Sequence, residues 1–387
     1  MLIRRPFWKK LIEEAWQEKN IVWLMGVRRI GKTSLCQSFD GIEYFDCELP
    51  RVRQLFDDPQ AFLDGQKGKI IALDEIHRLE NPSEILKIAA DYYPDIKVIA
   101  TGSSTLGASR KFKDTLTGRK REVWLTPLLL QEMTLFGSED LRRRFLFGGF
   151  PSFFTKKQLP ENDFQEWIDA YWAKDIQELF NVTKRSSFQK FTELLLINSG
   201  GMFEATTFTA PCEVVRATIL SYLDILEATF VVHIVRPFSE YKAAEITKAP
   251  KVYGFDTGFI NHAKGRNQLR DEDLGFMWEH CVLNEMHGHL QTRSINYWRD
   301  KRGNEIDFVI NHRTKNALTA IECKFNSSPD DLISTGLGKN FEAFRAYYPE
   351  GDNFIVSSNI DTSFKRSYKG LTITFVSVQE LISHLKS

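Results

Sequence analysis

The chain has 387 residues, of which 42% are hydrophobic and 26% are charged. This length predicts two or three domains, and the composition is that of a globular protein, which excludes low-complexity disorder, collagen and a coiled coil. Lysine and arginine together number 51, as do aspartate and glutamate, so the net charge of zero excludes nucleic-acid binding through bulk charge and leaves only a local basic patch for it.

The sequence has no feature of a membrane or secreted protein. The longest apolar runs, such as Ile21–Met25, are far shorter than the roughly 20 residues that span a bilayer, and residues 1–6 lack the apolar stretch of a secretory signal. Five scattered cysteines form neither a C-x-x-C pair nor an even disulfide set. We therefore expect a cytoplasmic protein that makes no contact with a membrane.

The first part of the chain alternates short apolar runs with helical segments. Four runs predict buried strands, at Ile21–Met25 and at residues 44–46, 69–73 and 97–100. Alternation of this kind is typical of βαβ units with a parallel sheet, so residues 1–137 are predicted to form an α/β domain. Residues 138–186 are predicted to be helical.

The strongest motif follows the first predicted strand. Residues 26–33 read Gly-Val-Arg-Arg-Ile-Gly-Lys-Thr and fit the P-loop pattern G-x-x-x-x-G-K-[ST], between a strand and a helix that should begin near Thr33. The loop N–H groups and the helix N-terminus would bind phosphate oxygens, Lys32 would reach the β- and γ-phosphates of ATP, and the Thr33 hydroxyl would ligate Mg²⁺. The residues expected to bind the nucleotide are Gly26, Arg29, Ile30, Gly31, Lys32, Thr33 and Ser34.

An acidic pair follows the third predicted strand. Asp74 and Glu75 come directly after residues 69–73, where a P-loop protein needs one carboxylate for magnesium and a second group for the attacking water. We assign Asp74 to the ion and Glu75 to the polarisation of the water, so hydrolysis should depend on Glu75.

Two later segments are candidates for the same site. Hydroxyls in residues 101–104, that of Ser103 among them, either contact the γ-phosphate and orient the water or belong to an ordinary serine-rich turn. Arg119 either acts as an arginine finger in the site of a neighbouring subunit or belongs to a solvated basic loop. The cations of that loop would be Lys111, Lys113, Lys120 and Arg121.

Residues 187–240 have the pattern of two helices followed by a β-ribbon. Apolar residues over 188–197 have helical spacing, a second helix is expected from about Thr209 with a proline in its first turn, and the β-branched run 229–235 predicts a strand. This order is that of a winged helix-turn-helix. Because Arg216 is the only basic residue in the second helix, docking to another part of the ATPase and reading of a DNA groove both stay open.

Residues 241–387 are predicted to be mixed α/β, with strands at 295–298, 305–310 and 318–325. Asp307 lies on the second of these strands. Glu322 and Lys324 share one face of the third, because alternate residues of a strand point the same way. An aspartate followed by Glu-x-Lys on the next strand is the arrangement of PD-(D/E)XK nucleases, where carboxylates hold Mg²⁺ and the lysine polarises water.

A helix expected over residues 276–290 supplies a further candidate ligand for this site, Glu279. Glu285 lies about 120° around the same helix and cannot serve together with it. The alternative is a nuclease-like domain used only for contacts, in which Glu322 and Lys324 simply pair. Cys323 should point into the core, and His287 and His289 should be surface residues, since their spacing is not that of a helical metal pair.

Together these motifs resemble a family of bacterial and archaeal AAA+-type ATPases with a restriction-endonuclease-like C-terminal domain of unknown function. The resemblance covers nearly the whole chain, and one departure is Val27, where the loop often has proline. The segments that carry it include residues 4–6, 26–33, 73–76, 101–104, 118–119, 125–128, 148–151, 175–176, 251–258, 305–308 and 321–324.

The resemblance implies an ATPase core over residues 1–137, a helical lid over 138–186, a winged-helix unit over 187–240 and a nuclease-like domain over 241–387. It also implies ATP and Mg²⁺ as cofactors, and a homo-oligomer, such as a nucleotide-dependent ring, whose subunits complete each other's ATP sites. Three functions stay open: an ATPase motor that processes DNA as a translocase or helicase, an ATP-gated metal-dependent DNA nuclease, and a nucleotide switch whose C-terminal domain only binds a partner.

Overall fold

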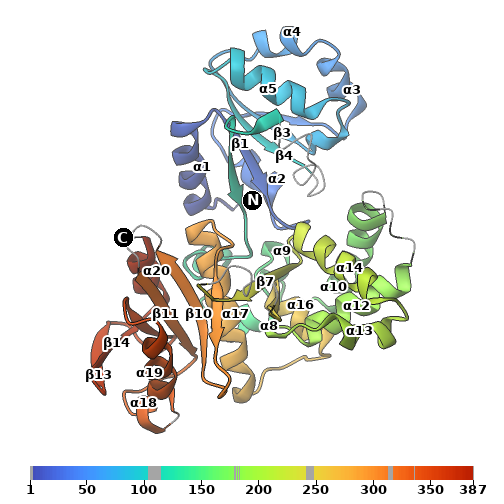
Figure 1. Ribbon diagram of the computed structural model, residues 1–387. Helices are drawn as coiled ribbons and strands as arrows, with labels where there is room; N and C mark the ends of the chain where they lie inside the picture. Colours follow the sequence, from blue (N-terminus) through green and yellow to red (C-terminus); the bar gives the residue numbers. More distant parts are fainter. Residues whose placement is uncertain are drawn as a thin grey trace. The chain divides into compact units, whose positions relative to one another are not determined.

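A computed structural model describes residues 3–102, 115–177, 180, 182, 184–240, 248–312, 317–334 and 336–386 (Figure 1). The chain forms two compact units, each discontinuous in sequence. Unit 1 consists of Met1–Glu139, Phe150–Arg185 and Asp224–Val231, and unit 2 of Asp140–Gly149, Ser186–Leu223 and Val232–Ser387. The chain thus crosses between units within both predicted regions 138–186 and 187–240.

Unit 1 contains a five-stranded parallel sheet of order β2-β3-β4-β1-β5. Its strands are β1 (Ile21–Met25), β2 (Glu43–Asp46), β3 (Ile70–Asp74), β4 (Lys97–Thr101) and β5 (Lys120–Trp124). The first four confirm the positions of the predicted strands to within a residue at each end, but β2 is only partly buried and not buried as predicted. The last corrects a prediction, because Lys120 and Arg121 lie in an edge strand rather than in a solvated loop.

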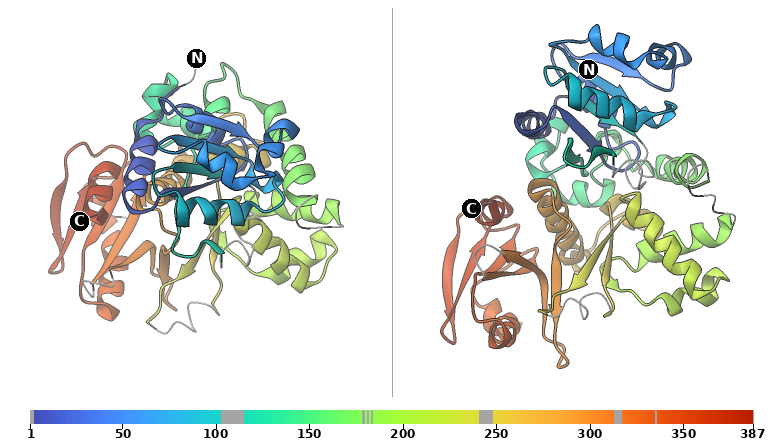
Figure 2. Two further views of the ribbon diagram at one scale, coloured as in Figure 1. Left: turned by 90° about the horizontal axis from the view of Figure 1, so that it is seen from above. Right: turned by 45° about the horizontal axis from the view of Figure 1, so that its top comes forward.

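Unit 1 also contains helical segments. They are α1 (Pro6–Glu18), α2 (Lys32–Gln37), α3 (Pro50–Arg53), η1 (Gln54–Phe56), α4 (Pro59–Asp64), η2 (Ile76–Arg78), α5 (Pro82–Tyr92), η3 (Leu130–Phe136), α9 (Pro151–Phe154), α10 (Glu161–Tyr171) and η4 (Trp172–Gln177). Helix α5 lies along the sheet and buries Leu86 and Ala89 in the core (Figure 2). Helix α1 buries Trp8, Ile12 and Trp16, which follow one helical stripe. Segment η4 is a π-helix, a rare form that is frequent at functional sites.

Unit 2 contains a nine-stranded mixed sheet of order β13-β14-β12-β11-β10-β9-β7-β8-β6. Its strands are β6 (Gly201–Met202), β7 (Val232–Pro237), β8 (Lys251–Gly254), β9 (Asn296–Arg299), β10 (Glu305–His312), β11 (Ala317–Lys324), β12 (Asn353–Ser357), β13 (Phe364–Tyr368) and β14 (Leu371–Val376). Parallel pairing of β7 with β9 joins its two halves. The predicted boundary at residue 240 therefore lies within one continuous sheet.

The remaining helices are α8 (Leu141–Phe147), α12 (Arg185–Ile197), α13 (Ala205–Cys212), α14 (Arg216–Ala228), α16 (Thr257–Ala263), α17 (Asp271–Leu290), α18 (Asp331–Ser334), α19 (Leu337–Tyr347) and α20 (Val378–Lys386). Helix α19 packs Phe341 and Phe344 against the C-terminal strands. Every helix in the described ranges is too short or too polar to cross a membrane. All five cysteines are free and buried.

Two predicted bounds within residues 187–240 were wrong. Helix α13 ends at Cys212 with Pro211 inside it, so proline is at the end of this helix and not at the start of the next. A break with Glu213 in the left-handed conformation (φ 55°) precedes α14. The predicted strand begins only at Val232, because Phe230 also has a left-handed φ of 65°.

Candidate functional site

The P-loop motif lies between β1 and α2, as its sequence context predicted. Gly26 has a φ of 142° and Gly31 a φ of 104°, values that residues other than glycine rarely adopt. A Cβ on Gly26 would lie 2.5 Å from the carbonyl oxygen of Leu125. Both glycines are therefore required for the loop to turn tightly from the strand into the helix.

Lys32 and Thr33 occupy the first turn of α2. The Lys32 ammonium donates hydrogen bonds to the carbonyl oxygens of Gly26 (2.9 Å) and Val27 (3.1 Å), which folds it back over the loop. Burial lowers the pKa of Lys32, and the charges of Glu75 and Asp175 oppose that shift. The ammonium is thus a largely desolvated cation over the loop, where it can bind an anion strongly.

Asp74, at the end of β3, accepts hydrogen bonds from three hydroxyl groups. Thr33 Oγ1 and Tyr44 OH donate to its Oδ2 at 2.7 and 2.6 Å, and Thr101 Oγ1 donates to its Oδ1. Thr101 also accepts from the backbone N–H of Glu75 at 3.1 Å. The Thr33 hydroxyl and the Asp74 carboxylate are oxygen donors in contact, which is the chemistry that Mg²⁺ requires, so the two residues fit the predicted ion.

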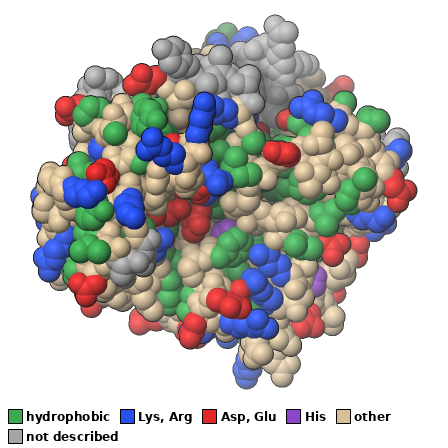
Figure 3. Space-filling model, turned by 60° about the horizontal axis from the view of Figure 1, so that its bottom comes forward, with side chains coloured by type: hydrophobic (Ala, Val, Ile, Leu, Met, Phe, Trp, Pro, Cys, Tyr) green, Lys and Arg blue, Asp and Glu red, His purple; other side chains and the backbone are tan. Residues whose placement is uncertain are grey.

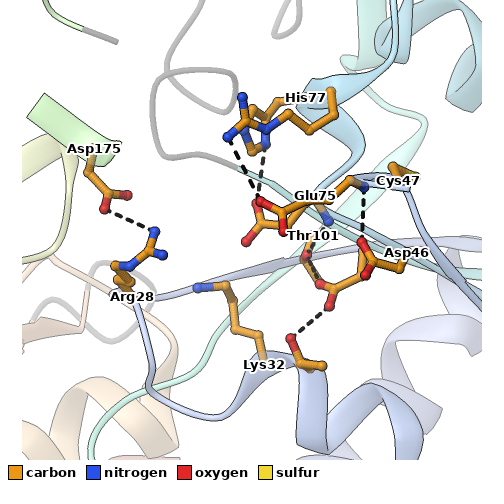
Figure 4. Close-up of polar contacts among 12 residues, drawn as sticks. Arg28, Lys32, Asp46, Cys47, Glu75, His77, Thr101 and Asp175 are labelled. Carbon is orange, nitrogen blue, oxygen red and sulfur yellow. Dashed lines mark hydrogen bonds and ion pairs between the residues drawn. The ribbon is translucent and has the colours of Figure 1, made fainter. Parts of the chain in front are cut away.

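Glu75 follows Asp74 in a left-handed conformation, with a φ of 53°. Its Oε2 lies 3.2 Å from Nδ1 of His77 (Figure 4). Burial acts to raise the pKa of Glu75, but the hydrogen bond from His77 and the charge of Lys32 outweigh it and lower the pKa. The side chain is therefore an ionised carboxylate beside the P-loop, as a group that polarises water must be.

Lys32, Thr33, Asp74 and Glu75 line a pocket of about 400 Å³ formed within unit 1. All but one of the predicted nucleotide-binding residues border it, the exception being Ile30, whose side chain is fully buried. Further lining residues lie outside the predicted ATPase core. They are Trp167, Tyr171, Lys174, Asp175, Thr229 and Val231.

One loop residue connects the P-loop to these later elements. Trp167 Nε1 donates to the carbonyl oxygen of Arg28 at 2.9 Å, and Nη1 of Arg28 lies 3.4 Å from Oδ2 of Asp175 (Figure 4). Sequence reasoning gave neither Arg28 nor Asp175 a role. The P-loop pattern accepts any residue at the Arg28 position, and Asp175 is 147 residues away in the chain, so spacing carried no signal for this pair.

Two other predicted site residues have different outcomes. Ser103 lies outside the described residues. Nε of Arg119 is 2.7 Å from Asp91 of α5, and Nη1 donates to the carbonyl oxygen of Thr115 at 3.2 Å, so its guanidinium is engaged within its own chain. A finger role would require Arg119 to leave Asp91, and it stays a prediction.

The nuclease-like candidates come from α17, β10 and β11. Asp307 accepts a hydrogen bond from the backbone N–H of Cys323 at 2.8 Å. Oε2 of Glu322 lies 3.7 Å from Nζ of Lys324, consistent with their predicted common face, and its Oε1 accepts from Nδ2 of Asn340 at 3.2 Å. Glu322 and Lys324 therefore pair, which is the arrangement that the alternative interpretation describes.

Glu279 lies beside β8. The hydroxyl of Tyr253 donates to it at 2.5 Å and Nζ of Lys251 is 3.8 Å away, although sequence reasoning gave Lys251 no part in this site. Burial, together with the charge of Asp307, raises the pKa of Glu279 to about 7. The same two causes raise the pKa of Glu322 well above its ordinary value. No three His, Cys, Asp or Glu residues in the described ranges are grouped so that they could hold a metal ion.

Neighbouring expectations had mixed outcomes. Cys323 is buried, as predicted. Glu285 pairs with His289 at 3.4 Å, apart from the candidate set. The prediction of a surface position for His287 was wrong, because this residue is buried and its ring packs edge-on against that of His233. The short i, i+2 spacing had argued only against a metal pair and said nothing about burial.

Comparisons with known proteins divide the chain into three segments. Residues 18–134 match a family described as "AAA domain". Residues 138–270 match a domain of unknown function, DUF8612, and residues 274–377 match another, DUF4143. A restriction-endonuclease-like fold is not among these descriptions.

Two curated relatives are similar over most of the chain. They are the uncharacterized protein Rv2008c of Mycobacterium tuberculosis and the uncharacterized protein Mb2031c of Mycobacterium bovis. Each is 26% identical over 322 residues, which is 80% of this chain and 72% of the relative.

Similarity to solved structures is weaker. A STAND protein with a tetratricopeptide repeat sensor from Pyrococcus horikoshii is 14% identical, with a TM-score of 0.29 over 73% of this chain and 46% of that one. A DNA polymerase III gamma subunit-related protein from Thermotoga maritima is 12% identical, with a TM-score of 0.25 over 58% of this chain and 97% of that one. The similarity of residues 18–134 to an AAA domain therefore depends on the sequence match, with which the P-loop between β1 and α2 agrees.

Proposed function

We propose that this protein hydrolyses ATP in the presence of Mg²⁺. The observation that carries the proposal is that Lys32, Thr33 and Asp74 line one pocket at the start of α2, where the Thr33 hydroxyl donates a hydrogen bond to the Asp74 carboxylate. When bound, the magnesium ion would neutralise phosphate charge, with Thr33 and Asp74 as the residues that hold it.

The other roles follow from the positions of charge. The N–H groups of the P-loop and the N-terminus of α2 bind phosphate oxygens, and Lys32 neutralises the phosphate charge that grows during transfer. Glu75 orients and polarises the attacking water, supported by its ionised state and by Lys32 nearby. His77 holds the Glu75 carboxylate from the side of η2.

We further propose that ATP turnover drives DNA processing. The element order α12, β6, α13, α14, β7, β8, with β8 paired antiparallel to both β6 and β7, supports a winged-helix unit. Against bulk binding of DNA, basic and acidic side chains are interspersed on the face shown in Figure 3. DNA would therefore be bound at a local site.

The test of this role is the rate of ATP turnover with single-stranded, duplex or branched DNA, measured against turnover without DNA. Stimulation by one of these structures supports the motor. Indifference to all three, together with slow turnover, supports instead the nucleotide switch. Size measurements with a non-hydrolysed ATP analogue, run beside this assay, test the proposed homo-oligomer.

An ATP-gated nuclease is the second candidate function. It is favoured by Lys324 lying on one strand face with Glu322, and by the influence of Asp307 on the pKa of Glu322. Cutting of DNA that needs Mg²⁺ or Mn²⁺ and disappears in both Asp307→Ala and Lys324→Ala would support it. Cutting that survives in either variant would exclude this site.

Thr101→Val is expected to weaken the binding of Mg²⁺ and so to raise the Mg²⁺ concentration that ATP turnover requires. The change leaves Oδ1 of Asp74 and the N–H of Glu75 without their hydroxyl partner in a buried place. Outer partners of metal ligands typically contribute about 10- to 100-fold to metal affinity, so half-maximal turnover should need roughly that much more Mg²⁺.

The matched control is Thr101→Ser, which keeps the hydroxyl and should stay within about threefold of the parent protein. Nucleotide binding without Mg²⁺ should be the same in all three proteins. An unchanged Mg²⁺ requirement in Thr101→Val would show that Asp74 needs no support from Thr101.

A further inference from the structure

The pair of Arg28 and Asp175 connects the P-loop to the π-helix η4. Trp167, just upstream in α10, holds the backbone of the same loop residue through its hydrogen bond to the Arg28 carbonyl. The loop is thus attached to the α10–η4 segment twice, once through the main chain of Arg28 and once through its charged side chain, which Figure 4 shows beside Asp175. Both attachments lie within unit 1.

The side-chain attachment is a poor ion pair. Its N···O distance of 3.4 Å is long compared with about 2.7–2.9 Å for a charged hydrogen bond, and it uses one guanidinium nitrogen. Nε of Arg28 is buried and has no hydrogen-bond partner in the described part of the chain. The Arg28 and Asp175 side chains are only 26% and 19% exposed, so water hydrates these two charged groups only in part. Arg28 therefore retains donor capacity for another acceptor.

Arg28 and Asp175 line the same pocket as Lys32 and Glu75. Burial raises the pKa of Asp175, while the positive charges of Arg28 and Lys32 oppose the shift and the negative charge of Glu75 adds to it. In P-loop enzymes the lysine reaches the γ-phosphate and the water-polarising acid acts beside it. Arg28 and Asp175 therefore lie near the place of the γ-phosphate.

We propose that Arg28 is a γ-phosphate-binding residue, which Asp175 holds in position while the triphosphate is absent. This inference rests on the proposed function. Planar, two-pronged contacts of arginine with phosphate are stronger than a long contact through one nitrogen, so a γ-phosphate would take the guanidinium from Asp175. The P-loop would then lose its side-chain attachment to η4 with ATP bound and keep it with ADP.

The test is calorimetric binding of MgADP and of a non-hydrolysed Mg·ATP analogue to four proteins: the parent, Arg28→Gln, Asp175→Asn and the double variant. Arg28→Gln should lower the affinity for the triphosphate analogue by roughly 10-fold or more, as loss of a charged hydrogen bond does. It should lower the affinity for ADP by less than about threefold. Asp175→Asn should raise the affinity for the triphosphate analogue several-fold. The change removes a carboxylate that repels the phosphates, and Arg28 no longer has to break an ion pair before it binds them.

The two effects should not add. Arg28→Gln should cost more triphosphate affinity when residue 175 is asparagine, since in that background the guanidinium loses only its phosphate contact. Arg28→Lys keeps the charge but lacks the planar guanidinium, so its affinity for the triphosphate should lie between those of the parent and Arg28→Gln. This variant gives a second measurement if glutamine disturbs the loop.

The matched control is the pair of Arg185 and Asp169, also an Arg–Asp contact in unit 1, at 3.1 Å and outside the pocket. Arg185→Gln and Asp169→Asn should leave both affinities unchanged. Three results would each overturn the inference. They are equal losses of affinity for ADP and the triphosphate in Arg28→Gln, a lower affinity for the triphosphate in Asp175→Asn, and binding free-energy changes that add exactly in the double variant. A parent protein that binds neither nucleotide would instead overturn the proposed function.

Discussion

Lys32→Ala is expected to abolish nucleotide binding, with a fall in ATP affinity of roughly 100-fold or more. The ammonium is partly buried at the edge of the pocket, where it donates hydrogen bonds to the carbonyl oxygens of Gly26 and Val27. Without it these oxygens and the incoming phosphates would face one another with no cation between them, and charged hydrogen bonds in such places contribute about 1.5–3 kcal/mol each. Calorimetry with Mg·ATP measures the loss directly.

The control for this change is Lys190→Ala, which removes an exposed lysine from α12 and its 3.5 Å contact with Glu213. That variant should bind ATP as the parent does. The free energy of unfolding of Lys32→Ala without nucleotide should change little, because the change removes a buried charge along with its hydrogen bonds. Retention of ATP affinity within about threefold would disprove the role of Lys32.

Glu75→Gln is expected to bind ATP normally and to lose turnover by about 10²- to 10⁴-fold, the usual contribution of a positioned general base. Glutamine keeps the shape of the side chain but cannot accept a proton or attract the water with a charge. Affinity should even rise slightly, since one negative charge near Lys32 disappears. Phosphate release and calorimetry together separate the two effects.

Glu80→Gln, an exposed acid five residues further along, serves as the control and should keep full turnover. If Glu75→Gln hydrolysed ATP at the parent rate, the water would have to be polarised by another group. Asp175 would then be the next candidate, because its carboxylate lies close enough to affect both Lys32 and Glu75.

The core of unit 1 could be predicted because its signals are local. Three of its five strands, β1, β3 and β4, are mostly apolar, and the glycines, lysine and threonine of the P-loop stand together in eight residues. Strand β5 was missed because its first three residues, Lys120, Arg121 and Glu122, are charged. An edge strand can carry such residues toward solvent, so its sequence resembles that of a loop.

The rest of the pocket could not be predicted from spacing. Trp167 and Asp175 reach Arg28 across 139 and 147 residues, and Thr229 and Val231 come from a third stretch of the chain. Their polar or aromatic character fits an ordinary helix equally well. In the same way, three strands of the C-terminal part were predicted, those observed as β9, β10 and β11, but strands β12, β13 and β14 and the pairing of β9 with β7 were not.

The junction between β7 and β9 affects how this protein can be divided. A fragment that begins at residue 241 would lack the strand that pairs with both β8 and β9. Its backbone N–H and C=O groups along those two strands would be open to other chains, which is a known route to aggregation and strand exchange. Fragments for biochemical work should therefore retain residues 232–237, even though this stretch precedes the segment that carries the nuclease-like residues.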